Sequence, residues 1–330
     1  MTSELPQSSK QPLVSAIIPS WNRRADLVRC LQSLSRQDYS NIEVVVVDDA
    51  SEDDTVDTLR RDFPSVQIVE DTVRCGHFFR RNQGIVVSQG KYLLHLDSDV
   101  DFQDEALVSR MVSRCEADPG IGEIGGEIPV HADVTDRAIG LVMTRGGYTR
   151  QVSVSVADGE ARECDVLPTL NCMTRREAVE KIGGFDPYYE FGMGDVDFGL
   201  AIKRAGYRNV LDGACAVYHR ASPGGRRADV TFRYCVGRLR LMLKNKGMMK
   251  VLMHGIWDLT RVAGLALYWP LGRVVGRELT DLQKDGVRFI ARAYVWCVTN
   301  HRQIRWARAR NFLSEVELKR YRDRKAADSQ

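Results

Sequence analysis

The chain has 330 residues, of which 44% are hydrophobic and 28% are charged. At about 150 residues per domain, this length allows two domains or one large α/β unit with an extension. The ordinary composition excludes a collagen-like, low-complexity or disulfide-stapled chain. The net charge is +3, but the charges are unevenly distributed along the chain. Residues 221–330 hold 23 Lys and Arg and 9 Asp and Glu, whereas residues 1–220 hold 24 Lys and Arg and 35 Asp and Glu. The basic third indicates an anionic partner: a membrane surface, a nucleic acid or the acidic part of the same chain.

The eight cysteines form no C-x-x-C pair and no cluster with histidine at zinc spacing. The first 12 residues are polar and lack the apolar core of a secretion signal, so we expect them to be a disordered lead. Reduced thiols and a cytoplasmic location are the simplest interpretation. The most apolar stretch, residues 262–275, is interrupted by Pro270 and Arg273 and is shorter than the roughly 18 residues that span a bilayer. No transmembrane helix is predicted.

Strand and helix patterns alternate regularly over residues 13–100. Short apolar or β-branched runs bounded by turn residues predict strands at 13–18, 42–47, 66–70 and 91–96. Helices are predicted around Leu27, Leu31 and Leu34, at 53–62 and at 77–89. This alternation predicts a parallel, doubly wound α/β sheet. No G-x-G-x-x-G turn follows the first strand, which argues against a dinucleotide site.

Residues 101–225 alternate less regularly. Strand patterns occur at 152–156, 163–167, 208–211 and 214–218, and helical patterns near 175–182 and 195–205. We expect this part to complete the sheet as the second half of a domain spanning 13–225. From residue 226 to 330 the sequence predicts basic, amphipathic helices with tryptophans among arginines.

Asp97 and Asp99 follow the fourth predicted strand. Alternate residues at a strand end share a face, and two adjacent carboxylates are tolerated best with a hard cation between them and a phosphate. A lone Asp-x-Asp is more often a solvated loop, but this pair is expected on the same sheet edge as Asp49, where ligands bind in such sheets. Asp101 is a weaker candidate. His219 ends a strand pattern and is predicted as a third ligand, whereas the other five histidines are assigned structural roles.

Asp195 stands at the predicted start of a helix. A carboxylate there caps the helix or acts as a general base on an acceptor hydroxyl, and both interpretations remain open at this point.

Seven segments together resemble a known family. They are VSAIIPSWNR (14–23), VVVVDDASEDDT (44–55), RRNQGI (80–85), GKYLLHLDSDV (90–100), CMTRREAVEKIGGFD (172–186), GDVDFGLAIKRAGYR (194–208) and His219. In this order and spacing they resemble the family 2 glycosyltransferases, inverting enzymes of the glycosyltransferase-A fold. The resemblance covers about residues 13–220 and implies a Rossmann-like, doubly wound mixed sheet, with a nucleotide-binding half at 13–100 and an acceptor half at 101–225.

The resemblance also implies roles for individual residues. Pro19, Ser20 and Asn22 match the turn that holds the nucleotide, Asp49 matches the carboxylate that reads the base, and Arg81 lies in the loop near the diphosphate. Asp97 and Asp99 match the site for Mg²⁺ or Mn²⁺, with Asp99 the direct ligand and Asp97 nearer the ribose and the metal-bound waters. His219 matches the histidine that joins this metal site, and Asp195 matches the catalytic base.

The implied reaction moves a sugar from a UDP-, dTDP- or GDP-linked donor to a glycan or lipid-linked acceptor, in the assembly of cell-surface polysaccharide or glycolipid. No nucleic-acid module is recognised. Residues 226–330 are predicted to attach peripherally to an anionic membrane surface, and packing on the acidic part of the chain or on a second copy in a homodimer is the alternative.

One departure from the family concerns Gly194, where relatives usually have glutamate before the base. Its loss weakens acceptor positioning, leaves that role to Glu190 or Asp197, or marks a degenerate protein that binds a nucleotide sugar without transferring it. The retained carboxylates and His219 favour an enzyme.

Overall fold

The computed structural model describes residues 11–129, 137–144, 148–189, 193–219, 228–246, 249, 251, 253, 256 and 291–328. Most of the predicted lead (1–12), together with Trp257 and Trp269 of the predicted basic helices, lies outside these residues.

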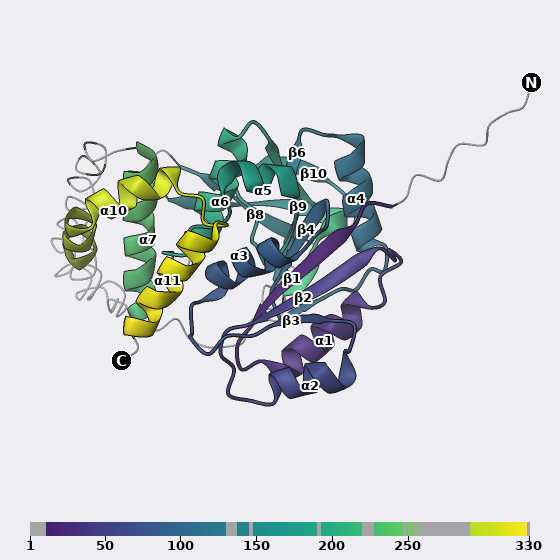
Figure 1. The fold of residues 1–330 in the computed structure, drawn as a ribbon. Helices are drawn as coiled ribbons and strands as arrows, with labels where there is room; N and C mark the ends of the chain where they lie inside the picture. Colours follow the sequence, from purple (N-terminus) through teal and green to yellow (C-terminus); the bar gives the residue numbers. More distant parts are fainter. Residues whose placement is uncertain are drawn as a thin grey trace, which may run out of the picture.

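A mixed sheet of eight strands forms the centre of the molecule (Figure 1), in the order β10-β12-β6-β11-β4-β1-β2-β3. Its strands are β1 (Val14–Ser20), β2 (Ile42–Asp48), β3 (Gln67–Val69), β4 (Tyr92–Leu96), β6 (Ile121–Gly125), β10 (Ala161–Cys164), β11 (Asn171–Arg175) and β12 (Arg208–Asp212). The four strands β3, β2, β1 and β4 run parallel, and β11 joins β4 to β6 antiparallel to both.

Helices cover both faces of this sheet. One face carries α1 (Arg24–Leu34), α2 (Thr55–Asp62) and α4 (Leu107–Ala117), and the other carries α3 (His77–Val87), α5 (Arg176–Ile182) and α6 (Gly194–Arg204). Successive strand residues point to opposite faces. Ala16 and Ile18 therefore join the first core and Ile17 joins the second.

A smaller five-stranded sheet adjoins the large one, in the order β5-β13-β7-β8-β9. Its strands are β5 (Val100–Asp101), β7 (Glu127–Pro129), β8 (Arg137–Met143), β9 (Thr149–Ser155) and β13 (Val217–His219), and a 3₁₀ turn, η1 (Gly213–Cys215), precedes β13. In the antiparallel β5–β13 pair, His219 lies opposite Val100. This register brings His219 next to Asp99.

The C-terminal region is helical where it is described. Its elements are α7 (Ala228–Lys246), α10 (His301–Trp306), η2 (Ala307–Ala309) and α11 (Glu315–Asp328). α7 packs against α10 through Leu239, Leu243 and Ile304, and α11 lies beside α3 (Figure 1), with the Tyr321 ring 5.2 Å from that of Phe79. None of the described helices combines the length and the apolar character that crossing a bilayer requires.

The predicted elements of residues 13–100 agree with the structure to within two residues at each end. The parallel arrangement holds for four strands, but the sheet continues with the antiparallel β11, which no apolar run predicts. Its sequence NCMTR is polar and yet fully buried. Burial is tolerated because the Asn171 amide donates to the carbonyls of Gly126 (3.0 Å) and Cys215 (2.9 Å). The strand predicted at 163–167 is also displaced, since β10 ends at Cys164.

Candidate active site

Polar and acidic side chains gather at the carboxyl ends of β1, β2 and β4. They line an open cleft of about 230 Å³ whose walls are Pro19, Ser20, Trp21, Arg23, Asp49, His77, Asp97, Ser98 and Asp99. Three distant segments of chain meet here because parallel strands direct their carboxyl ends to one edge of the sheet. The predicted gathering of the first turn, Asp49 and the Asp97–Asp99 pair on one edge is observed.

Asp49 is buried, and its carboxylate accepts three hydrogen bonds. Oδ1 accepts from the Cys75 amide (2.7 Å) and from Arg80 Nε (2.7 Å), and Oδ2 accepts from the Gly76 amide (2.9 Å). A carboxylate has about four acceptor positions. The contacts among the described residues therefore leave Oδ2 able to accept one more N–H group from a ligand.

Arg80 links Asp49 to the C-terminal helix. Its Nη1 lies 3.1 Å from Asp71, and Arg322 of α11 donates to both oxygens of Asp71 at 2.9 Å. Burial acts to raise the pKa of Asp71, but the Arg322 and Arg80 guanidinium groups outweigh it and lower the pKa to about 2. The series Asp49–Arg80–Asp71–Arg322 thus joins the cleft to a helix at the other end of the chain.

The carboxyl end of β1 supplies two of the three predicted nucleotide residues to the cleft. Pro19 and Ser20 line it, and the buried Ser20 hydroxyl has no hydrogen-bond partner in the described part of the chain. Asn22 does not line the cleft. Its amide N–H donates to Ser51 Oγ (2.9 Å) and its Oδ1 accepts from the Glu52 amide (2.7 Å). Asn22 therefore fastens the turn after β1 to the turn after β2.

Arg81 lies beneath the cleft and does not form part of its wall. The side chain is completely buried, and it donates to the Leu96 carbonyl (3.1 Å) and to Asp97 Oδ1 (2.5 Å). Arg81 was expected at the diphosphate, but the structure places it beneath the cleft. There it orients the half-exposed carboxylate of Asp97.

Asp99 and His219 are the two predicted metal ligands that lie close together. His219 Nε2 is 3.5 Å from Asp99 Oδ1, and His219 Nδ1 is 2.7 Å from Glu127 Oε1. The second oxygen of Asp99 accepts from Arg23 Nη1 at 2.6 Å. Burial acts to lower the pKa of His219, but Asp99 and Glu127 outweigh it and raise the pKa to about 10.

The donor set of Asp99 and His219 suits a divalent cation that completes its shell with phosphate. Adjacent ligands of an octahedral ion about 2.1 Å away lie about 3 Å apart, close to the observed separation of Asp99 Oδ1 and His219 Nε2. A carboxylate on Nδ1 leaves Nε2 to face an ion, as in many histidine metal sites. The described residues contain no cluster of three or more such side chains, and Asp97 faces Arg81 instead. Two protein ligands match the sparse coordination of Mg²⁺ at phosphate-binding sites.

Asp195 lies in the first turn of α6 and is tied to Asp97 through two consecutive residues. Its Oδ1 accepts from Thr169 Oγ1 (2.6 Å), and the carbonyl of the next residue, Leu170, accepts from the Asp97 amide (3.1 Å). The N-cap residue is Met193 and its side chain makes no capping hydrogen bond, so Asp195 is not the N-cap and lies instead in the first helical turn. Burial raises the pKa of Asp195 to about 6, although the Thr169 hydrogen bond and Arg81 act to lower it.

Packing explains why residue 194 is a glycine. A Cβ built on it would lie 2.1 Å from Phe78 Cε2, so the Phe78 ring occupies the space that a glutamate side chain would need. That ring stacks on Phe185 at 5.6 Å, and Phe185 stacks on Phe198 at 3.9 Å. The space beside Gly194 is thus filled by an aromatic stack.

Asp197 does not take over the missing glutamate's role. It is buried and paired with Lys244 of α7 at 2.6 Å, and Lys244 also pairs with Asp186 at 3.1 Å. Arg240 completes this buried group by donating to Asp186 at 2.8 Å. Glu190, the other proposed substitute, lies outside the described residues.

Sequence reasoning missed Arg23, His77 and Glu127. Arg23 and His77 line the cleft, although His77 was assigned a purely structural role. Burial and the nearby Arg81 lower the pKa of His77 to about 4, so it is neutral at physiological pH. Glu127 lies on the short strand β7, and only its pairing with β13 reveals its contact with His219.

Comparison with solved structures identifies the class of fold. The mannosyltransferase PcManGT from Pyrobaculum calidifontis, solved with GDP-Man and Mn²⁺, is 18% identical with a TM-score of 0.54, and the match covers 98% of this chain and 89% of that one. GalNAc-T7, solved with UDP, GalNAc and Mn²⁺, is 14% identical with a TM-score of 0.58, covering 89% of this chain and 58% of that one. The fold is that of the glycosyltransferase-A class, with C-terminal helices added.

Sequence comparison then gives the family. Residues 15–183 match the family described as Glycosyl transferase family 2, and the chain belongs to this family. Glycosyltransferase AglE from Haloferax volcanii is 28% identical over 262 residues, which cover 76% of this chain and 82% of that protein. The protein is therefore a glycosyltransferase by family. A second relative, the putative colanic acid biosynthesis glycosyl transferase WcaA from Escherichia coli, is 34% identical over 100 residues, which cover 29% of this chain and 36% of that protein.

Proposed function

We propose that this protein is an inverting, metal-dependent glycosyltransferase that moves a sugar from a nucleoside diphosphate to an acceptor hydroxyl. We assign this transfer reaction to residues 13–225. The observation that carries the proposal is the carboxylate of Asp195, with its pKa raised to about 6, joined through Thr169 and Leu170 to the edge that holds Asp97. A general base works best when its pKa lies near the working pH.

The proposed reaction is a single displacement. Asp195 takes the proton of the acceptor hydroxyl as the oxygen attacks the anomeric carbon of the donor sugar. The bond from that carbon to the diphosphate oxygen breaks, and its electron pair leaves with the nucleoside diphosphate. Attack opposite the leaving group inverts the anomeric configuration.

The cleft residues are assigned to the donor. Asp99 and His219 would hold Mg²⁺ or Mn²⁺, which supplies positive charge to the departing diphosphate when bound. Arg81 orients Asp97 toward the ribose. Pro19 and Ser20 form the nucleotide wall, and Oδ2 of Asp49 would accept the base N–H that uracil, thymine and guanine each offer. This supports a UDP-, dTDP- or GDP-linked donor, and two structural neighbours were solved with GDP-Man or UDP.

The degenerate, non-catalytic alternative receives little support from the packing. Its motivation was Gly194, and the Phe78 ring accounts for that glycine. A protein that only binds a nucleotide sugar would also not need a carboxylate near pKa 6 beside the donor edge.

An assay of donor turnover tests the proposal. UDP-, dTDP- and GDP-sugars are incubated with the full chain and Mn²⁺, and release of the nucleoside diphosphate is measured with and without chelator. We expect release that chelator abolishes and that Asp99→Ala lowers at least a hundredfold, while the midpoint of thermal unfolding changes by only a few degrees.

Asp104→Ala provides the control, because Asp104 is an exposed carboxylate that pairs with Arg110 at 2.7 Å. It should turn over as the wild type does. Undiminished release in the presence of chelator contradicts the metal assignment. Proton NMR of the product gives the anomeric configuration, and retention contradicts the single displacement.

We also propose that the chain works at the cytoplasmic face of a membrane, attached through residues 226–330. The support is the excess of basic residues there, eight free cysteines, and the exposed Met249, Met253 and Ile256, which recur at i, i+4 and i+7 in helical residues. Part of the basic charge is used internally, since Arg240, Lys244 and Arg322 pair with Asp186, Asp197 and Asp71.

Liposome flotation of the full chain tests this attachment. Removing residues 226–330 would also remove α7 and leave the buried Asp186 and Asp197 without their partners Arg240 and Lys244, so the test instead replaces Met249, Met253 and Ile256 with glutamate. The wild type should float with anionic vesicles at low salt and the triple variant should not. Equal flotation of both proteins, or none, contradicts the membrane proposal and favours packing within the chain or between two copies.

A further inference from the structure

The loop of residues 70–76 connects β3 to α3, and we call it the donor loop. It carries two of the three groups that donate to Asp49, which are the backbone amides of Cys75 and Gly76. The third group is the side chain of Arg80, which lies one turn into α3. The orientation of the Asp49 carboxylate therefore depends on the conformation of the donor loop.

The last helix, α11, holds the donor loop near both of its ends. Arg322 donates to both oxygens of Asp71 at 2.9 Å, which is a bidentate pair. The adjacent Tyr321 is buried, and its hydroxyl lies 3.4 Å from the carbonyl oxygen of Cys75. Two neighbouring residues of one helix thus contact the loop at two points that are four positions apart.

One buried guanidinium is shared by two carboxylates beneath the cleft. Arg80 Nε donates to Asp49 at 2.7 Å, and Arg80 Nη1 lies 3.1 Å from Asp71. Asp71 also accepts from the Val73 amide at 3.2 Å, which fixes the start of the donor loop. Arg322 supplies a second cation to Asp71, so Arg80 can remain on Asp49. Without Arg322, the two carboxylates would compete for one cation.

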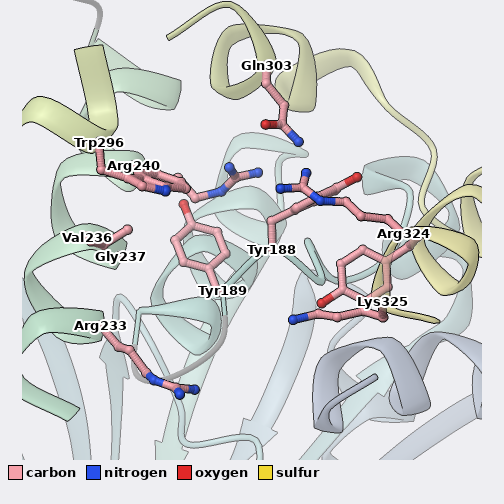
Figure 2. Close-up of a pocket in the computed structure, with 11 residues that line it drawn as sticks. Tyr188, Tyr189, Arg233, Val236, Gly237, Arg240, Trp296, Gln303, Arg324 and Lys325 are labelled. Carbon is pink, nitrogen blue, oxygen red and sulfur yellow. The ribbon is translucent and has the colours of Figure 1, made fainter. Parts of the chain in front are cut away.

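Contacts outside the donor loop fix the position of α11. The Phe312 amide, just before the helix, donates to the Gly183 carbonyl at 2.8 Å. The ring of Tyr188 lies edge-on to that of Tyr321 at 5.0 Å. The same ring lies 5.5 Å from the Arg324 guanidinium, in a cavity of about 170 Å³ between α11 and α7 (Figure 2). Because α11 is held independently, Arg322 can impose a position on the donor loop.

We propose that Arg322 is a positioning residue for recognition of the donor base. It acts through Asp71 and holds the donor loop in the conformation in which Asp49 accepts the base N–H. Neither Arg322 nor Asp71 lines the cleft, so the effect falls on donor binding and leaves the displacement step unchanged. This inference rests on the proposed function for the role of Asp49, whereas the restraint of the loop by α11 does not.

The size of the effect follows from the population of the binding-competent loop. The Asp71 side chain is only 5% exposed, so removal of its bidentate partner leaves a buried carboxylate with one cation fewer. If this lowers the competent population to about one-tenth, the apparent Kd of the donor rises about tenfold while its intrinsic affinity is unchanged.

Steady-state kinetics and calorimetry of the full chain with Mn²⁺ test the assignment. The probes are UDP, dTDP and GDP and their sugars. Arg322→Ala should raise the KM of the donor that the wild type uses, and the Kd of the matching nucleoside diphosphate, about tenfold. At saturating donor, kcat should change by less than about twofold. Arg322→Lys keeps the charge without the bidentate geometry and should restore part of the lost affinity.

Methylation of the base N–H separates an effect on Asp49 from a general loosening of the protein. The probes 3-methyl-UDP, 3-methyl-dTDP and 1-methyl-GDP lack the proton that Asp49 would accept. The wild type should prefer the unmethylated nucleotide by at least about tenfold, as expected for a hydrogen bond to a charged group. Arg322→Ala should lose most of this preference, because its Kd rises for the unmethylated nucleotide alone. An equal rise for both nucleotides overturns the positioning role.

A double-mutant cycle tests the route of the effect. If Arg322 acts through Asp71, adding Arg322→Ala to Asp71→Asn should raise the Kd by less than about twofold. A full tenfold rise in the Asp71→Asn background overturns transmission through Asp71.

Hydrogen exchange tests the restraint of the loop without any nucleotide. The amides of residues 70–76 should exchange at least about tenfold faster in Arg322→Ala, because the loop opens more often. Arg320→Ala is the matched control, since Arg320 lies on the same helix, is 55% exposed and pairs with Glu317. It should match the wild type in exchange, KM and kcat.

The two proposals fail in different ways. Normal turnover by the wild type together with an unchanged KM and unchanged loop exchange in Arg322→Ala contradicts this inference alone. Failure of the wild type to bind or turn over any of the three nucleotides contradicts the proposed function and the base-positioning role with it. Faster loop exchange in Arg322→Ala would still support the restraint of the loop by α11 in that case.

Discussion

The hydroxyl of Thr169 gives the most direct test of the acid–base role of Asp195. Thr169→Val keeps the shape of the side chain and removes the 2.6 Å hydrogen bond that lowers the pKa of Asp195. A hydrogen bond to a charged group contributes about 1.5–3 kcal/mol, and one pKa unit equals 1.36 kcal/mol. The pKa of Asp195, already raised by burial to about 6, should therefore rise by roughly one to two units in the variant.

The pH dependence of kcat measures this change. The wild type should lose activity below pH 6, about tenfold per unit, because a protonated base cannot accept the hydroxyl proton. In Thr169→Val the same acid limb should move to roughly pH 7–8, with a similar plateau above it. Thr58→Val is the control, since Thr58 is a buried threonine whose hydroxyl has no partner in the described residues.

Asp195→Asn completes this test with two opposite effects. Transfer should fall by roughly two to four powers of ten and the acid limb should vanish. Stability should rise instead: because the folded-state pKa is about 6 and the unfolded one about 3.9, the wild type loses stability as pH rises through this window. Urea unfolding at pH 8 should show a gain of up to about 3 kcal/mol that disappears near pH 4. An acid limb that stays at pH 6 in Thr169→Val, or persists in Asp195→Asn, refutes the assignment.

Three other changes test the packing around the site by urea or thermal unfolding. Gly194→Glu should cost about 1–3 kcal/mol because its Cβ meets Phe78, and adding Phe78→Ala should cost less than the sum of the two single changes. Lys244→Met leaves Asp197 without its buried cation and should cost about 3–5 kcal/mol, whereas the exposed Lys319→Met should change stability by less than about 0.5 kcal/mol. Burial raises the pKa of Glu123 to about 8, so wild-type stability falls as pH rises from about 5 to 8. The unfolding midpoint of Glu123→Gln should therefore exceed that of the wild type by an amount that grows over this pH range. A difference in midpoint that stays constant with pH would contradict the raised pKa.

The gathering of acidic residues at one edge of the sheet was predictable because a local rule governs it. A buried β-branched strand such as β2 ends in a turn at the sheet edge, so the sequence alone brings Asp49 to the cleft with Asp97 and Asp99. Arg81 shows the limit of this reasoning. An arginine in a helix is expected at a polar surface, but here the side chain is buried, and its two terminal nitrogens donate to the Leu96 carbonyl and to Asp97.

The residues that sequence reasoning missed depend on contacts between distant segments. Glu127 lies on a three-residue strand with no periodic pattern, and its importance comes only from the pairing of β7 with β13.

The ion-pair series from Asp49 to Arg322 has a consequence for how the protein is made. Asp71 and Arg322 are 251 positions apart, so α11 must leave the ribosome before Arg322 can support Asp71 and, through Arg80, the carboxylate of Asp49. A growing chain would complete the strands of the sheet early, while Asp49 at the cleft still lacks this support. Proteolytic loss of a few C-terminal turns would return a finished enzyme to that immature state.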